Sequence, residues 1–136
     1  MKLHYQVDGE DFQRAGEASV ALKRTLKQLG MDAAIIRKIA IAMYEAEINM
    51  VIHADGGCID VDISPSQIIV VLKDSGPGIP DIDLAMKAGY STATHQIREL
   101  GFGAGMGLPN MKKYSDELQV QSEVGVGTTV TITINL

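Results

Sequence analysis

The sequence is poor in cysteine, in positive charge and in long apolar runs, and each shortage excludes a class of protein. Its one cysteine, Cys58, cannot form a disulfide within the chain and argues against a cysteine metal cluster. No apolar run is long enough to cross a bilayer, and the N-terminus lacks the pattern of a secretory leader. We therefore expect a soluble protein of the reducing cytoplasm.

Lysine and arginine number 12 against 17 acidic residues, which gives a formal net charge of -5. This balance disfavours a domain that binds along a nucleic acid through many phosphate contacts. The chain has no Gly-Lys-Ser or Gly-Lys-Thr and no glycine triplet with dinucleotide-fold spacing, so it is neither a P-loop nor a Rossmann protein. Nucleophile-elbow and helical zinc-ligand motifs are missing too, and His4, His53 and His95 are too scattered for a metal site.

The length fits one domain, residues 1–136, large enough to bury a core. Alternation over Leu3–Val7 predicts an edge strand, and helical spacing over Glu10–Leu29 predicts a first helix. A second helix, capped by Asp32, should run to about His53. It has almost no polar face, so we expect it to be buried.

The second half of the chain predicts a strand pair, a short helix, a mobile glycine-rich segment, a third helix and a closing strand pair. In that order they cover Cys58–Ile63 with Ile68–Leu72, Asp83–Lys87, Gly89–Gly105, a helix from Leu108, and Leu118–Val120 with Val130–Leu136. Because Ile68–Leu72 is apolar on both faces, it should be central. These elements predict an α/β two-layer sandwich, a mixed and mostly antiparallel sheet with helices on one face.

Glu45, Asn49 and His53 are spaced by four residues and share one side of the second helix. A carboxylate buried without a partner is costly, so this stripe should face a cleft, an ion or a hydrogen-bond network. An exposed stripe near a helix end is an equally open interpretation. Glu47 points elsewhere, and we expect it to be solvated.

Asp74 follows the predicted central strand and begins the segment Asp-Ser-Gly-Pro-Gly-Ile. Gly76 and Gly78 allow a sharp reversal and let a flat ligand approach the backbone. The Asp74 carboxylate could accept a hydrogen bond from an exocyclic amine. An ordinary turn has the same composition, so this segment alone is only suggestive.

Glycine recurs at every second residue immediately before the third helix, at Gly101, Gly103, Gly105 and Gly107. Unhindered backbone amides and the positive end of a helix suit a triphosphate. A flexible linker is the alternative, and the helix that follows weakens it. Lys112 and Lys113 add positive charge nearby or form a solvated face of that helix.

The order of these elements is more specific than any one of them. Glu45–Asn49 with His53, DSGPGIPD over Asp74–Asp81, GFGAGMGLPNM over Gly101–Met111 and GVGTTVTITI over Gly125–Ile134 together resemble the ATP-binding superfamily of gyrase, heat-shock chaperones, histidine kinases and MutL. The sequence is most similar to the small bacterial anti-sigma factors and switch serine kinases within it. The resemblance implies a Bergerat-type ATP-binding fold.

The resemblance also implies roles for single residues. Glu45 would be the general base, Asn49 the magnesium ligand, Asp74 the acceptor for the adenine amine, and Thr128 a water-mediated adenine contact. The segment Thr94–Leu100 is longer than the matching lid that the resemblance to the switch kinases implies, a departure that bears on the choice of partner. The full set of nucleotide contacts implied is Asn49, His53, Asp74, Gly76, Gly78, Ile79, Gly101, Gly103, Gly105, Met106, Gly107, Leu108 and Thr128.

The leading hypothesis is a serine/threonine protein kinase that uses ATP and Mg and phosphorylates a small antagonist protein. One alternative is a nucleotide-responsive module that sequesters a sigma factor or another regulator with little phosphotransfer. Another is the detached catalytic domain of a histidine kinase, disfavoured because no phosphoacceptor helix precedes the first strand. A homodimer is plausible, with the apolar side of Leu3–Val7 as the only hint, and we expect residues 91–102 to be disordered without nucleotide.

Overall fold

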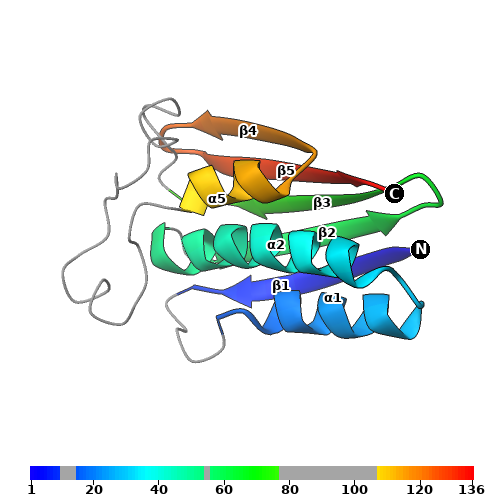
Figure 1. Cartoon of the computed structure of the whole chain (residues 1–136). Coiled ribbons are helices and arrows are strands. Elements are labelled where there is room, and N and C mark those ends of the chain that lie inside the picture. Colours follow the sequence, from blue (N-terminus) through cyan, green and yellow to red (C-terminus); the bar gives the residue numbers. More distant parts are fainter. Residues whose placement is uncertain (10–14, 54–55, 77–106) are drawn as a thin grey trace.

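The computed structural model describes residues 1–9, 15–53, 56–76 and 107–136. Their strands form one sheet, and their helices cover one face of it (Figure 1). The predicted two-layer α/β sandwich is therefore confirmed. In chain order the elements are β1 Lys2–Asp8, α1 Glu17–Gln28, α2 Ala33–His53, β2 Gly56–Ile63, β3 Gln67–Asp74, α5 Gly107–Tyr114, β4 Glu117–Glu123 and β5 Gly127–Asn135.

The sheet has the strand order β1-β2-β3-β5-β4, and every pairing among the described strands is antiparallel. β1 lies at an edge and β3 in the centre, as predicted. Alternation explains the faces, because residues two apart on a strand point the same way. On β5, Val130, Ile132 and Ile134 are buried under the helices, while the threonines between them face outward and are only half-buried.

Helix α2 lies between α1 and α5 across the sheet (Figure 1). Asp32 caps it, because its Oδ1 accepts a hydrogen bond of 2.7 Å from the backbone N–H of Ala34. Its apolar side chains fill the space between the layers, and Met43 and Ile39 are almost completely buried. No helix in the described ranges is both long and apolar enough to cross a membrane.

One expectation for the N-terminal half needs correction. The first helix begins at Glu17 rather than Glu10. Gly16 has a left-handed φ of 95°, which a continuous helix through this position does not allow. Residues 10–14 are not among the described residues. The apolar side of Leu3–Val7 is half-buried against the core of its own chain, and the homodimer stays a prediction.

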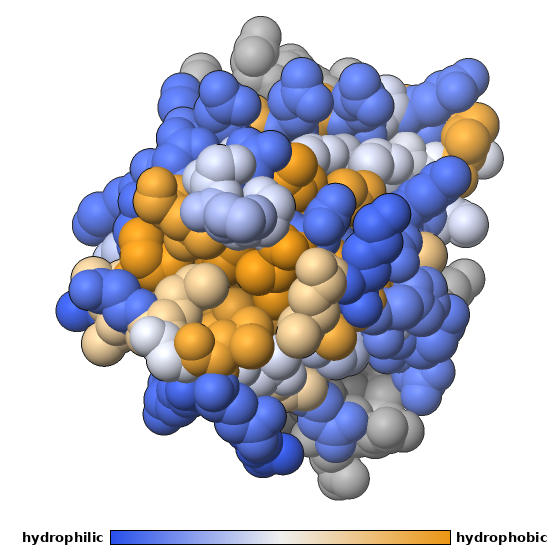
Figure 2. Space-filling view, turned by 90° about the vertical axis from the view of Figure 1, so that its right-hand side faces the viewer, coloured by the Kyte–Doolittle hydropathy of each residue, from blue (hydrophilic) through white to orange (hydrophobic). Residues whose placement is uncertain are grey.

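Both ends of the chain lie at the same end of the sandwich (Figure 1). The N-terminal ammonium donates to the carbonyl of Ile63 at 2.9 Å, and the N–H of Leu136 donates to the carbonyl of Ser66 at 2.9 Å. The two ends are thus bonded to either side of the β2–β3 turn. Figure 2 shows apolar side chains gathered at this end, where Met1, Leu29 and Leu136 are exposed.

Candidate functional site

The predicted site residues on α2, β3 and β5 lie toward the end of the sandwich opposite the two termini. This end contains the last turns of α2, the end of β3, and the beginnings of β5 and α5 (Figure 1). Asp74 is the last residue of β3, and Thr128 is the second residue of β5. Antiparallel pairing of β3 with β5 brings them together although 54 positions separate them in the chain.

The Asp74 carboxylate is held in one orientation by the backbone. Its Oδ1 accepts hydrogen bonds from the N–H of Gly76 at 2.9 Å and from the N–H of Thr128 at 3.1 Å. It lies on the same face of β3 as the buried Leu72, so it points toward the helix layer at the rim of the core. A half-buried carboxylate held in this way is a preorganised acceptor for a ligand that lies at the end of the sheet.

Glycines flank Asp74 on both neighbouring strands, and neither position has room for a side chain. A Cβ on Gly127 would lie 2.2 Å from the carbonyl oxygen of Asp74, and a Cβ on Gly57 would lie 2.2 Å from that of Lys73 and 2.6 Å from Cε of Met50. The strands therefore approach each other closely on either side of this carboxylate. Thr128 is buried, and its hydroxyl makes a 2.9 Å hydrogen bond with the hydroxyl of Ser122.

Glu45 and Asn49 are both half-buried on α2, whereas Ala46, Ile48 and Met50 beside them are buried. Glu45 Oε1 accepts a 3.3 Å hydrogen bond from the side-chain amide of Asn110 in the first turn of α5. Glu45 thus faces α5, and this one hydrogen bond is what the described residues show of the network expected for the stripe. An amide oxygen and a carboxylate one turn apart are suitable hard ligands for Mg²⁺.

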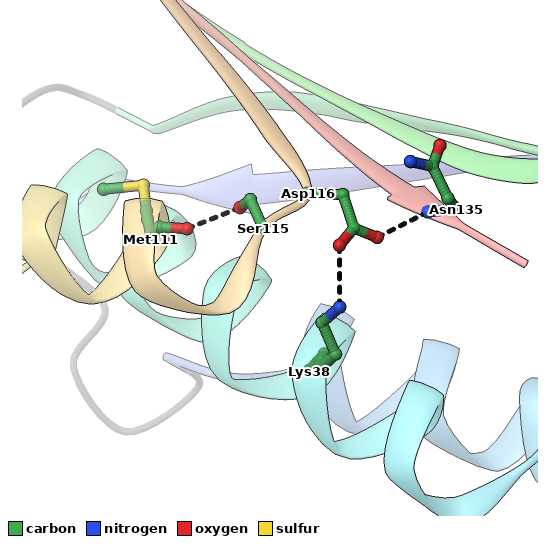
Figure 3. Close-up of polar contacts among 5 residues, drawn as sticks. All are labelled: Lys38, Met111, Ser115, Asp116 and Asn135. Carbon is green, nitrogen blue, oxygen red and sulfur yellow. Dashed lines mark hydrogen bonds and ion pairs between the residues drawn. The ribbon is translucent and has the colours of Figure 1, made fainter.

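The position of α5 is determined by contacts at its C-terminal end (Figure 3). The side chain of Met111 is fully buried, and its carbonyl accepts a hydrogen bond from the hydroxyl of Ser115. Asp116 forms a 2.9 Å ion pair with Lys38 on α2 and accepts a 2.7 Å hydrogen bond from the N–H of Asn135. Lys38, followed by the Asn135 N–H, lowers the pKa of Asp116 below its ordinary value.

Glu47 contradicts the expectation that it is solvated, because only 2% of it is exposed. Its Oε2 accepts from the N–H groups of Gly16 at 2.9 Å and Ala18 at 3.2 Å. Its Oε1 accepts from the N–H of Ser19 at 3.0 Å and from the Ser19 hydroxyl at 2.7 Å. Glu47 is therefore the N-terminal cap of α1, since Gly16 has no side chain to satisfy the first amides of that helix.

Tyr44 lies beside this cap. An added Cβ on Gly16 would lie 2.9 Å from its ring, so the glycine is required by both its φ and the space. Burial raises the pKa of the Tyr44 hydroxyl above its ordinary value, and the charges of Glu45 and Glu47 raise it further. Tyr44 can therefore report on both carboxylates.

Several predicted site residues fall outside the description. The side chains of His53 and Leu108 are in this group, although His53 ends α2 and Leu108 is the second residue of α5. Helix α5 begins at Gly107, close to the predicted start, and Lys112 and Lys113 are exposed on it. The short helix at residues 83–87, the disorder of residues 91–102, and the contacts of Gly78, Ile79, Gly101, Gly103, Gly105 and Met106 stay predictions.

Sequence reasoning missed Asn110, Ser122 and Gly57. Asn110 lies within the quoted GLPNM segment, but no spacing rule connects it with Glu45, which is 65 positions away. Ser122 could have been suspected from its place on a strand that pairs with Thr128. Gly57 precedes the predicted strand Cys58–Ile63, whereas in the structure it pairs with Asp74 inside the sheet.

Two solved structures have the same fold. The RsbU and RsbW domains of a Mycobacterium tuberculosis protein match with a TM-score of 0.66 and 18% identity, over 98% of this chain and 32% of that one. The mycobacterial sensor histidine kinase MprB matches with a TM-score of 0.56 and 20% identity, over 98% of this chain and 97% of that one. At these identities the matches demonstrate the fold alone.

Sequence relatives are more informative. The chain is 31% identical to the serine/threonine-protein kinase RsbT of Bacillus subtilis, over 79% of this chain and 78% of that protein. It is 34% identical to the anti-sigma F factor of Thermoanaerobacter sp. (strain X514), over 98% of this chain and 91% of that protein. The family profile described as histidine kinase-, DNA gyrase B- and HSP90-like ATPase matches residues 34–136. The chain therefore belongs to the histidine kinase-, DNA gyrase B- and HSP90-like ATPase family, among relatives named as a serine/threonine kinase and as anti-sigma factors.

Proposed function

We propose that this chain is a single-domain, cytoplasmic serine/threonine protein kinase of the anti-sigma or switch type. It uses ATP with Mg²⁺ and phosphorylates a small antagonist protein in a partner-switching system. Membership of the ATPase family and the kinase name of the Bacillus subtilis relative support this proposal.

The observation that carries the proposal is the convergence of Glu45 and Asn49 with Asp74 at one end of the sandwich. Asp74 is held by two backbone N–H groups, so its orientation does not depend on a flexible side-chain partner. Glu45 is held from α5 through Asn110. The three side chains come from two elements that the buried core keeps in place, which is the preorganisation that a catalytic site requires.

In this proposal each side chain has one task. Asp74 accepts a hydrogen bond from the adenine amine, and Thr128 contacts the adenine through water. The oxygen of the Asn49 amide holds Mg²⁺, which supplies charge neutralisation at the phosphates when it is bound. Glu45 accepts the proton of the substrate hydroxyl as that oxygen attacks the γ-phosphorus.

The test is phosphotransfer from labelled ATP to candidate antagonist domains. We expect label on serine or threonine, loss of transfer in Glu45→Ala with ATP binding retained, and loss of binding in Asp74→Asn. Asn49→Ala should remove the part of the affinity that depends on added Mg²⁺. Glu117→Ala, an exposed carboxylate on β4, is the control that should behave as wild type. Absence of calorimetric heat with MgATP would refute the proposal.

The alternative function is a nucleotide-dependent protein-binding module with little or no phosphotransfer. The relatives named anti-sigma F factor favour it. ATP-dependent capture of a sigma factor, together with no label on any partner and no effect of Glu45→Ala on capture, would support this module over the kinase. Label on histidine would instead indicate histidine-kinase chemistry.

A further inference from the structure

We propose that Asn110 is a positioning residue that holds the Glu45 carboxylate in the orientation needed to accept the substrate proton. The inference rests on the proposed function only for the role of Glu45. The contact itself is a feature of the fold, because it joins two helices that are far apart in the chain.

The contact has a defined polarity. The side-chain nitrogen of Asn110 can only donate, and an ionised carboxylate can only accept, so the 3.3 Å bond runs from Asn110 Nδ2 to Glu45 Oε1. No other hydrogen bond to Glu45 is present among the described residues. Among the described residues, Asn110 is therefore the group that holds the Glu45 carboxylate in one orientation.

Asn110 is itself held in place by the way α5 lies on α2. Figure 1 shows the two helices running in opposite directions. Lys38 and Glu45 are seven residues apart on α2, which is two helical turns along one face. Lys38 binds Asp116 just beyond the end of α5, and Glu45 binds Asn110 near its start (Figure 3 shows the first of these contacts).

Between these two contacts, Met111 anchors α5 in the core with a fully buried side chain. A helix attached to its neighbour near both ends and in the middle has little freedom to rotate or slide. The amide of Asn110 is therefore presented to Glu45 by the packing of α5, rather than by the choice of one rotamer on a mobile segment.

The chemical consequence concerns the free oxygen of Glu45. With Oε1 held by the amide, Oε2 is oriented to receive the proton. The substrate hydroxyl oxygen then forms its bond to the γ-phosphorus, the bond from that phosphorus to the bridging oxygen breaks, and ADP leaves with the electron pair. A carboxylate free to rotate would spend part of its time with neither oxygen facing the hydroxyl, which lowers kcat without changing nucleotide binding.

The first test is a double-mutant cycle in the phosphotransfer assay. Asn110→Ala and the isosteric Asn110→Asp should each lower kcat by roughly tenfold, the size expected for one hydrogen bond to a charged group, and leave the affinity for MgATP within about twofold. In a Glu45→Ala background, Asn110→Ala should leave the residual transfer rate unchanged, measured at raised enzyme concentration. Glu117→Ala, an exposed change on the neighbouring strand β4, is the control. Equal losses in both backgrounds would overturn the proposal, because a purely structural role does not depend on Glu45.

The second test needs no activity and uses NMR of the resting protein. The side-chain amide protons of Asn110, assigned by comparison with Asn110→Asp, should shift on Glu45→Ala and stay unchanged on Glu117→Ala. If Asn110 is insensitive to Glu45, the positioning role is wrong even for an active kinase. If the shift occurs but no partner is phosphorylated, the hydrogen bond from Asn110 to Glu45 is supported, and only the proposed kinase activity is refuted.

Discussion

The buried carboxylate of Glu47 allows a stability prediction with a magnitude. Glu47→Ala removes four hydrogen bonds at once and leaves the N–H groups of Gly16, Ala18 and Ser19 without their acceptor. Each unsatisfied buried donor costs about 1–3 kcal/mol. Water can compensate in part, because a cavity of about 30 Å³ lined by Glu47 lies beside the cap and holds roughly one molecule. We therefore expect a loss of about 3–5 kcal/mol in the free energy of unfolding.

The measurement is urea denaturation followed by circular dichroism. The m-value of each variant should equal the wild-type value, which checks two-state behaviour. Glu47→Gln retains one acceptor oxygen and should lose less, about 2 kcal/mol. Glu117→Ala should stay within about 0.5 kcal/mol of wild type. Amide exchange should quicken first at Ser19 and its neighbours. A loss below about 1 kcal/mol for Glu47→Ala with an unchanged m-value would refute the capping argument.

Three further predictions follow from single contacts. Gly127→Ala should lower the free energy of unfolding by about 2–4 kcal/mol and weaken ATP binding, because the added Cβ collides with a backbone carbonyl. The control is Gly125→Ala, at φ 82° in open space, which should lower it by only about 1 kcal/mol in the same denaturation assay. Asp116 has a lowered folded pKa, so the unfolded state binds more protons in acid. Asp116→Asn should therefore lower the free energy of unfolding by about 1 kcal/mol above about pH 4. This difference from wild type should disappear as the pH falls through the folded pKa of Asp116, which unfolding curves recorded across that range measure. Burial is the larger cause of the raised pKa of Tyr44 and the charge of Glu45 adds to it, so Glu45→Gln should lower this pKa part of the way toward 10.0. Phenolate absorbance during alkaline titration measures the pKa, and an unchanged value would contradict the electrostatic effect of Glu45.

Periodicity predicted most of the described fold because the core here depends on it. The strict alternation of threonine with valine and isoleucine on β5 can only place one set inside, and the structure buries Val130, Ile132 and Ile134. Asp32 was recognisable as a cap because its acceptor lies two residues from the N–H it binds. Such local rules need no knowledge of distant residues.

The failures all involve partners distant in the chain. Glu47 carries no local sign of burial, and its four donors lie about thirty positions earlier on a different helix. The start of α1 was placed too early because apolar spacing continues across Gly16, whose φ is stabilised by packing against Tyr44 and by the Glu47 cap. The link from Asn110 to Glu45 likewise exists only once α5 is packed on α2.

The location of the two chain ends has a practical consequence for experiments on binding. Because Met1 and Leu136 are both bonded beside the β2–β3 turn, an affinity tag or a surface tether on either one emerges away from Asp74 and Glu45. Immobilised protein would present the proposed nucleotide-binding end to solution in a uniform orientation. The closeness of the two ends also suits a circular permutant in which a short glycine linker joins them.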